Sequence, residues 1–177
     1  MTAGGPVDGT DGRIGEAWSG EVPNGSHINV VLARRGSATA AAAVGTLASP
    51  RPGILPYLAC LSPGTLVRPV TIVVNKVPLV EPRLERITWG ASQLGIAQGV
   101  LDAVSDGILD PAEADDVVVL IAVWVDPDAH DETAVKRANR EATRAAIGDA
   151  LAHHDAAAVR ALAARREQAA NGYYGGE

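Results

Sequence analysis

The sequence predicts an α+β fold in which helices pack on one side of a β-sheet. Segments with the apolar periodicity of strands alternate with segments of helical periodicity, in the order β-β-α-β-β-α-β-α. The strand-like segments are rich in β-branched residues, whereas alanine, which favours helix, is abundant in the second half. No internal repeat is evident, so we expect one domain with terminal extensions.

The first strands are expected near the N-terminus. Residues 1–12, rich in Gly, Thr and Asp without periodicity, are predicted to be a disordered leader. Residues 13–21 and 26–33 are predicted to be strands, because the Val-Pro-Asn-Gly segment at 22–25 has the chemistry of a turn. This pair would form a hairpin.

The next segments alternate between helix and strand. Ser37 is suited to cap a short helix over residues 38–47. The apolar run 54–61 has the length of a strand, and its Cys60 is expected to be a small buried hydrophobe. Residues 68–77 are rich in β-branched side chains and predict a further strand.

The clearest amphipathic helix of the chain follows. Pro82 suits its first turn, and the helix is expected to end near Gly107. Residues 110–113 then predict a turn or a single helical turn. The apolar residues that recur at helical spacing are Leu84, Ile87, Ala91, Leu94, Ala97, Leu101 and Val104.

A strand and a long helix complete the predicted domain. Residues 117–125 carry no charge, which predicts a strand covered on both faces. A helix with a small-residue face starts near Glu132, and a break is expected near His153. The domain would therefore span residues 13–152, and residues 153–177 would form an alanine-rich tail, helical or frayed.

Composition restricts the class of protein. The chain has 177 residues, 47% of them hydrophobic, which is ample for one core. A formal net charge of −6 argues against nucleic-acid binding as the main role. The single cysteine allows no internal disulfide and fits a reducing compartment. No signal peptide or apolar run of ~18 residues is evident, so we expect a cytoplasmic protein that does not bind membranes.

A few polar side chains are candidates for a site. Because alternate residues of a strand face opposite sides, His27 and Asn29 share the side away from the main core face, and Lys76 and Pro78 share a side in the same sense. Gln93 lies beside the main apolar stripe of its helix. Taken singly, each is better explained as a solvated strand end or a half-exposed helix residue than as part of a site.

Several common motifs are absent. The chain has no phosphate-binding glycine loop of either common type. The segment 90–94 begins like a nucleophile elbow, but it lacks the closing glycine and lies inside a predicted helix, so we reject a serine hydrolase. His153 and His154 are adjacent and cannot share a helix face, so no metal site is predicted.

Short segments along the chain carry a family resemblance. Over about residues 14–152, the chain resembles the formaldehyde-activating enzymes, which condense formaldehyde with tetrahydromethanopterin to a methylene derivative. The matching segments are Gly15-Glu-Ala17, Ser26-His-Ile28, Arg68-Pro-x-Thr71, Asn75-Lys-Val77, Trp89-Gly-x-x-Gln93, Glu113-Ala-Asp-Asp116 and Asn139-x-Glu-Ala-Thr143.

The resemblance implies both an architecture and a site. The fold would be like the second domain of ribosomal protein S5, in a homopentamer that binds the pterin between subunits. The pterin would be a co-substrate, with no tightly bound cofactor. His27 would be the proton donor, because loss of hydroxide from a carbinolamine needs a donor active near neutral pH. The implied substrate contacts are Asn29, Leu58, Lys76, Pro78 and Gln93.

The chain departs from the family at two of these positions. The family has Asp where this chain has Asn29, and Thr where it has Pro78. Asn29 loses a negative charge, and Pro78 loses a hydroxyl and a backbone donor. These departures motivate an alternative of a different class, a non-catalytic protein that binds an aldehyde or a pterin on the same scaffold.

Overall fold

A mixed sheet lies at the centre of the protein. The computed structural model describes residues 9–152 and 155–168. In spatial order, the five strands of the sheet are β1 (Arg13–Ser19), β2 (Ser26–Arg34), β7 (Val117–Val125), β6 (Val70–Asn75) and β3 (Tyr57–Leu58). Only β6 and β7 run parallel to each other, and the other neighbours are antiparallel.

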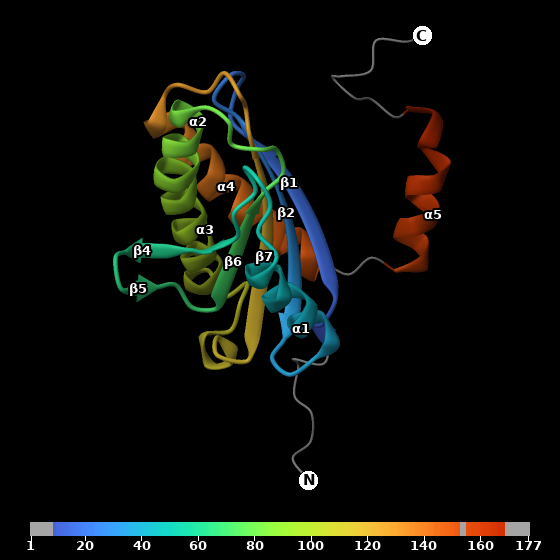
Figure 1. Ribbon diagram of the computed structural model, residues 1–177. Helices are drawn as coiled ribbons and strands as arrows, with labels where there is room; N and C mark the ends of the chain where they lie inside the picture. The colour runs from blue at the N-terminus through green and yellow to red at the C-terminus, as the bar shows by residue number, and fades with distance from the viewer. Residues whose placement is uncertain (1–8, 153–154, 169–177) are drawn as a thin grey trace.

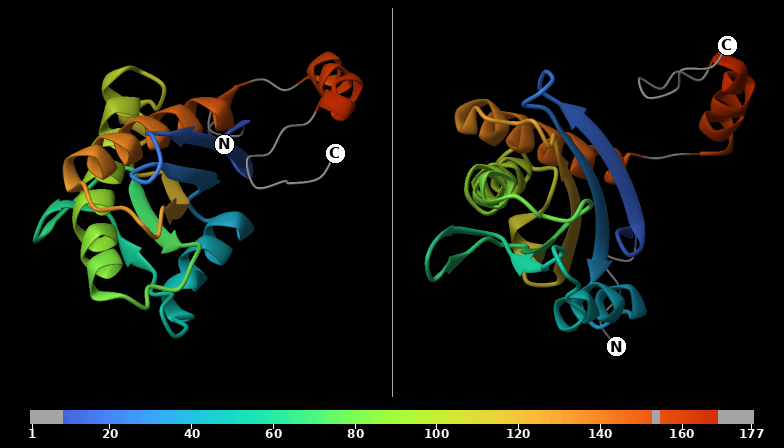
Figure 2. Two further views of the ribbon diagram at one scale, coloured as in Figure 1. Left: turned by 90° about the horizontal axis from the view of Figure 1, so that it is seen from above. Right: turned by 45° about the horizontal axis from the view of Figure 1, so that its top comes forward.

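Two helices cover one face of this sheet. They are α3 (Gln93–Ser105) and α4 (Glu132–Leu151), which pack against each other (Figure 1). Figure 2 shows the sheet curving around this pair. Ile28 and Val30 of β2 are fully buried beneath them in the main core. The predicted α+β class, with helices on one side of a sheet, is thereby confirmed.

Glycines allow the two helices and the sheet to pack closely. A Cβ added at Gly95 of α3 would lie 2.3 Å from the carbonyl oxygen of Lys136, and one at Gly99 would lie 2.5 Å from that of Arg140. A Cβ at Gly15 of β1 would lie 2.2 Å from the carbonyl oxygen of Ala146 in α4. Such distances exclude any side chain, so these glycines are required by helix packing.

A short helix packs on the opposite face at one end of the sheet. In α1 (Ala38–Gly45), Ser37 accepts a hydrogen bond from the backbone of Ala40, as predicted for the cap. The helix contributes to a second, smaller core with Ala33 and Val118. These two residues alternate with those that face α3 and α4, so the second core lies on the other side of the sheet.

Two predicted elements are only partly present. In place of a strand over 54–61, the chain forms β3 and the separate strand β4 (Cys60–Ser62), which pairs with β5 (Thr65–Leu66) and has an irregular register. Pro56 offers no backbone donor at the start of this run. Cys60, predicted to be buried, is only half-buried.

The predicted helix over residues 82–107 is also interrupted. It consists of α2 (Pro82–Ile87), a π-helical turn (Thr88–Ser92) and α3. Pro82 occupies the first turn as predicted. The strand β7 matches the predicted range. However, Leu120, Ala122 and Trp124 on its second face are only half-buried, so the prediction that both faces of this strand are covered is wrong for the single chain described here.

The predicted leader and tail lie only partly within the described residues. Residues 1–8 lie outside the described residues, but Asp11 accepts hydrogen bonds from the backbone of Arg34 and from Ser37, which lower the pKa of its carboxyl group. The helix α5 (Ala156–Ala164) follows α4 and has no buried residue. His153 and His154 also lie outside the described residues.

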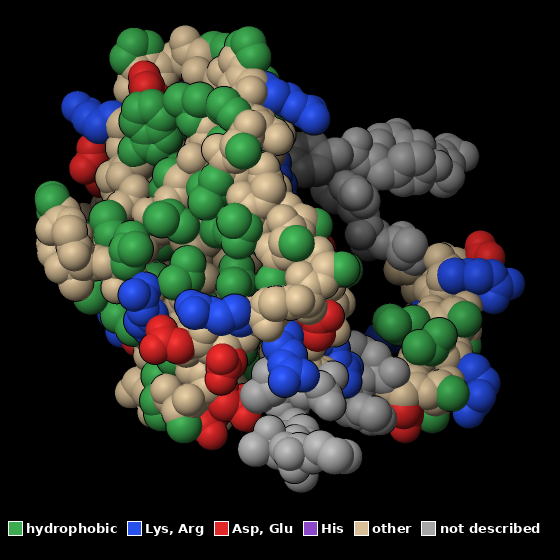
Figure 3. All heavy atoms as spheres, turned by 60° about the horizontal axis from the view of Figure 1, so that its bottom comes forward, with side chains coloured by type: hydrophobic (Ala, Val, Ile, Leu, Met, Phe, Trp, Pro, Cys, Tyr) green, Lys and Arg blue, Asp and Glu red, His purple; other side chains and the backbone are tan. Residues whose placement is uncertain are grey.

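One face of the molecule combines apolar and charged side chains. In the view of Figure 3, acidic and basic side chains lie interspersed along one side of a broad apolar area. Within the described part of the chain, no helix combines the length and the apolar character that a membrane span requires.

Candidate functional site

The face of the sheet opposite α3 and α4, which α1 covers only at one end, carries a row of polar and aromatic side chains. We call it the open face. His27 and Asn29 point to this face, because they alternate with the core residues of β2. In the β1–β2 hairpin, Glu16 lies directly opposite Asn29, and Trp18 lies opposite His27. On the other side of β2, Trp124 of β7 also lies opposite His27. His27 is therefore flanked by two indole rings.

Lys76 reaches the same place from the far side of β7. Its backbone N–H donates to the carbonyl oxygen of Val123 at 2.8 Å, which extends the β6–β7 pairing by one residue. Its Nζ lies 3.0 Å from Nδ1 of His27 and 3.4 Å from the His27 carbonyl oxygen. The structure thus brings together two residues whose convergence the sequence did not show.

A carboxylate completes the cluster. Oε2 of Glu16 lies 3.0 Å from Nε2 of His27 and accepts a hydrogen bond from Nδ2 of Asn29 at 3.3 Å. An ionised carboxylate only accepts hydrogen bonds, so Nε2 of a neutral imidazole carries the proton and donates it to Glu16. Nδ1 then keeps its lone pair and accepts from the Lys76 ammonium. We call Glu16, His27, Asn29 and Lys76 the imidazole cluster.

The environment of Lys76 acts on its protonation. Burial lowers the pKa of the Lys76 amine, because the ammonium loses part of its hydration, while the negative charge of Glu16 acts in the opposite direction. The net shift is downward. A larger share of this amine is therefore neutral at a given pH than for a fully solvated lysine.

Aromatic rings form one side of the imidazole cluster. The centroid of the Trp18 ring lies 5.4 Å from that of Trp124 and 6.4 Å from that of His27. Nε1 of Trp18 donates to the carbonyl oxygen of Gly20 at 3.1 Å, which fixes the ring. A Cβ at Gly25 would lie 2.6 Å from the same ring, so the glycine leaves room for it. The 46% exposure of Trp18 leaves a flat apolar surface beside the polar groups.

A buried polar network holds the start of β2 in place. Nδ2 of Asn139 in α4 donates to Oγ of Ser26 at 2.7 Å, and Oγ of Ser92 donates to Oδ1 of Asn139 at 2.9 Å. All three side chains are buried. Since Ser26 precedes His27, this network links the position of the imidazole to α4 and to the π-helical turn.

The other predicted contacts lie elsewhere in the chain. Leu58 of β3 packs against the second core around α1. Pro78 lies beside Gly53, where an added Cβ would come within 2.8 Å of the proline ring. Gln93 begins α3, behind the sheet, and its Nε2 donates to Sγ of Cys60 at 2.9 Å. For the described residues, no hydrogen bond joins these three to the imidazole cluster.

Glu16 is the member of the imidazole cluster that is absent from the site residues predicted from the sequence. A signal for it was present, because the predicted hairpin sets residues 16 and 29 opposite each other if residues 19 and 26 flank the turn. Following the period of two along β1 would then have placed its carboxylate on the face of His27.

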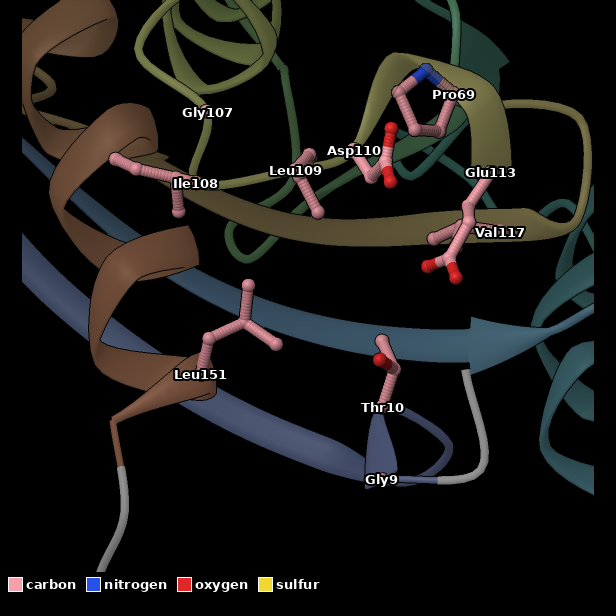
Figure 4. A pocket seen from close by; sticks show the side chains of 10 residues that line it. All are labelled: Gly9, Thr10, Pro69, Gly107, Ile108, Leu109, Asp110, Glu113, Val117 and Leu151. Carbon is pink, nitrogen blue, oxygen red and sulfur yellow. The ribbon is translucent and has the colours of Figure 1, made fainter. Parts of the chain in front are cut away.

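The cavity in Figure 4 is a separate feature. It has a volume of about 380 Å³ and lies at the opposite end of β7, where Leu109 and Val117 meet Leu151 at the end of α4. None of the predicted site residues lines it. One of its acidic groups, Asp110, caps the short helix Pro111–Glu113 by accepting from the backbone of Ala112. Among the described residues, no three potential metal ligands gather in one place.

The fold and the imidazole cluster define a class: α+β proteins with an imidazole, an amine and a carboxylate on the open face of a sheet. A family model described as formaldehyde-activating enzyme matches residues 14–173. The chain therefore belongs to the formaldehyde-activating enzyme family, as its resemblance to that family predicts. The match extends past residue 152, where the predicted domain ends.

Individual relatives agree with this assignment. The chain is 38% identical over 138 residues to the 5,6,7,8-tetrahydromethanopterin hydro-lyase of Methanosarcina barkeri, and the alignment covers 78% of each chain. It is 31% and 32% identical to the bifunctional enzymes Fae/Hps of Methanothrix thermoacetophila and Archaeoglobus fulgidus, respectively. The alignment covers only 35% of each bifunctional relative.

Proposed function

We propose that this protein is a lyase that condenses formaldehyde with tetrahydromethanopterin to the methylene derivative and water. Membership of the formaldehyde-activating enzyme family, with a relative named as a tetrahydromethanopterin hydro-lyase, carries the proposal. The imidazole cluster supports it, because it supplies an acid and an amine on an accessible face.

The chemistry matches the groups present. A pterin amine adds to formaldehyde and gives a carbinolamine, and departure of its hydroxyl as water requires a proton. His27, one-third exposed, supplies this proton from its imidazolium form, in which both ring nitrogens carry a proton. The resulting iminium is closed by the second pterin amine, whose proton returns to the imidazole. A positioned acid of this kind contributes a rate factor of about 10² to 10⁴.

The proposed pterin contacts are assembled from more than one chain. In this proposal Asn29 and Lys76 bind the pterin beside His27. Leu58 and Pro78 belong to the same binding region. Gln93 lies behind the sheet of its own chain, so a neighbouring copy would bring it to the site. A homopentamer with sites between subunits meets this requirement.

The remaining expectations belong to the same proposal. The fold would be like the second domain of ribosomal protein S5, formed by residues 13–152, and residues 153–177 would be an alanine-rich tail. The protein would act in the cytoplasm with formaldehyde and the pterin as its small-molecule partners, without a tightly bound cofactor. The similarity to a hydro-lyase favours turnover over the non-catalytic alternative.

The test is the rate of methylene-pterin formation above the spontaneous reaction. We expect His27→Ala to lose about 10²-fold or more in this rate. His130→Ala is the matched control, because His130 is exposed, does not belong to the imidazole cluster and has its Nδ1 3.1 Å from the carbonyl oxygen of the nearby Asp128. Equal rates for His27→Ala and the parent would reject His27 as the acid.

The non-catalytic alternative has a test of its own. The double variant Asn29→Asp with Pro78→Thr restores the residues of the family at both departures. If the parent binds the pterin without turnover and only the double variant forms the methylene product, the protein is a binding protein on this scaffold. Turnover by the parent excludes that reading.

A further inference from the structure

The amine of Lys76 has a setting suited to a reaction of its own. Lys76 is one of two lysines in the chain, the other being Lys136 on α4. Its backbone is fixed by the hydrogen bond to Val123, and its Nζ lies 3.0 Å from Nδ1 of His27. Beyond holding a substrate, an amine in contact with an acid–base group can attack a carbonyl compound.

We propose that Lys76 is a catalytic nucleophile that captures formaldehyde as an iminium and passes its carbon to the pterin. In this route the carbinolamine forms on Lys76 in place of the pterin, and the pterin meets the iminium. The capture step needs only formaldehyde, whereas the transfer step rests on the condensation proposed above. Formaldehyde is small enough to reach a half-buried amine. The pterin would then meet an aldehyde carbon that is already activated and held beside His27.

The imidazole cluster provides each proton transfer of the capture. Nδ1 of His27 takes a proton from the Lys76 ammonium, and the neutral amine forms a C–N bond to formaldehyde, whose carbonyl becomes a hydroxyl. The imidazolium returns its proton to that hydroxyl, the C–O bond breaks, and water leaves. Overall, Lys–NH₃⁺ and CH₂O give Lys–NH⁺=CH₂ and H₂O, with no change of oxidation state.

The transfer returns the enzyme to its starting state. A pterin amine forms a bond to the iminium carbon and loses its proton to the Lys76 nitrogen. The C–N bond to Lys76 breaks, the lysine leaves as an amine, and the second pterin amine closes the ring. The proton released in that closure restores the ammonium. No oxidant or reductant is consumed.

The neighbours of Lys76 are arranged for this sequence. Glu16 accepts from Nε2 of His27, so the lone pair of the ring is directed at Lys76 and not at solvent. When the ring takes the second proton, the carboxylate stabilises the imidazolium across the same 3.0 Å contact. The lowered pKa of the Lys76 amine also favours the neutral, nucleophilic form.

The two lysines allow an internally controlled test. The full-length protein is treated with formaldehyde and cyanoborohydride without pterin, and N-methylation is quantified at each lysine by peptide mass spectrometry. We expect Lys76 to be methylated about tenfold faster than Lys136, or more. This factor is smaller than the rate factor of about 10² to 10⁴ that a positioned acid or base contributes. Equal or slower methylation of Lys76 would overturn the proposal.

Two additions link the trapped species to the reaction. Tetrahydromethanopterin added before the reductant should discharge the iminium and lower methylation at Lys76 but not at Lys136. His27→Ala should lower methylation at Lys76 alone. An unchanged Lys76 signal in both experiments would overturn the role of the iminium as an intermediate.

A charge-preserving variant separates capture from binding. Lys76→Arg keeps a cation that can donate to Nδ1 of His27 and to a pterin, but it cannot form the iminium. We expect its methylene-pterin rate to fall about 10²-fold or more, and full activity would overturn the proposal. If the parent condenses the pterin without methylation at Lys76, capture is wrong and the proposed function stands. If Lys76 is selectively methylated but no pterin is consumed, the proposed function is wrong and capture stands.

Discussion

Nζ of Lys76 lies 3.0 Å from Nδ1 of His27, although the two residues are 49 positions apart in the chain. They meet because β7 lies between β2 and β6, with His27 opposite Trp124 on one side and Asn75 opposite Val123 on the other. The pair therefore depends on the register of two strand pairings. A one-residue slip in either pairing would turn one of the side chains to the other face.

Removal of the carboxylate at position 16 should impair turnover without unfolding the protein. In Glu16→Gln, the partner of Nε2 of His27 loses its charge, and a hydrogen bond to a charged group contributes about 1.5–3 kcal/mol. We expect kcat to fall by about tenfold or more, with a smaller change in KM. Glu16→Asp should recover part of the loss, and Glu167→Gln, a change in the short 3₁₀ turn Arg166–Gln168 that follows α5, should have no effect.

A spectroscopic measurement distinguishes this role from a structural one. The ¹⁵N chemical shifts of the His27 ring report which nitrogen carries the proton. We expect the Nε2–H form in the parent and a mixture of both forms in Glu16→Gln, because an amide can either accept or donate. If the ring keeps a single Nε2–H form in the variant, Glu16 does not set the tautomer.

The pH dependence of methylation at Lys76 should reflect its environment. Burial lowers the pKa of this amine from the ordinary value of 10.5, so the neutral form should appear, and methylation should rise, at lower pH than for a solvated lysine. Glu16 acts against this shift by stabilising the ammonium. In Glu16→Gln the midpoint of the rise should therefore move to still lower pH, and a move to higher pH would contradict this electrostatic account.

The contact between α3 and α4 should tolerate no side chain at position 95. A methyl group there would lie 2.3 Å from the carbonyl oxygen of Lys136, so Gly95→Ala forces the helices apart and should cost about 1–3 kcal/mol or more of unfolding free energy. Gly148→Ala is the matched helical control, because nothing lies within 4 Å of its added Cβ. That variant should be neutral or stabilising, by up to about 1 kcal/mol. Both are measured by urea unfolding.

An ion pair between α3 and α4 should make the stability of the protein depend on pH. Nη2 of Arg140 donates to Oδ1 of Asp102 at 2.7 Å, and this interaction lowers the pKa of the Asp102 carboxyl below its ordinary value of 3.8. The stabilisation is therefore present above the ordinary value and is lost as the pH falls through the lowered pKa. Asp102→Asn should reduce the Tm at pH 7, and the difference from the parent should vanish in strong acid. A difference that persists there would indicate a packing effect.

Local patterns in the sequence were sufficient for most individual elements. The uncharged run 117–125 is β7, the Ser37 cap starts α1, and Pro82 starts a helix. These features depend on side chains close together in the chain, such as a cap with the third backbone N–H after it. The sequence did not predict the π-helical turn before Gln93. It also did not predict that the strand expected over residues 54–61 divides into β3 and β4, with an irregular register in the pairing of β4 with β5. Both irregularities depend on contacts with other elements.

The sequence by itself determined the residue types available for chemistry and the face of β2 on which His27 and Asn29 lie, because strand alternation is a local property. Only the tertiary structure decided that Lys76 and Glu16 contact this imidazole and that Gln93 lies behind the sheet. The physical reason is that strand order follows from burying one face of the whole sheet under α3 and α4. That burial is a property of all the strands together, and no short segment encodes it.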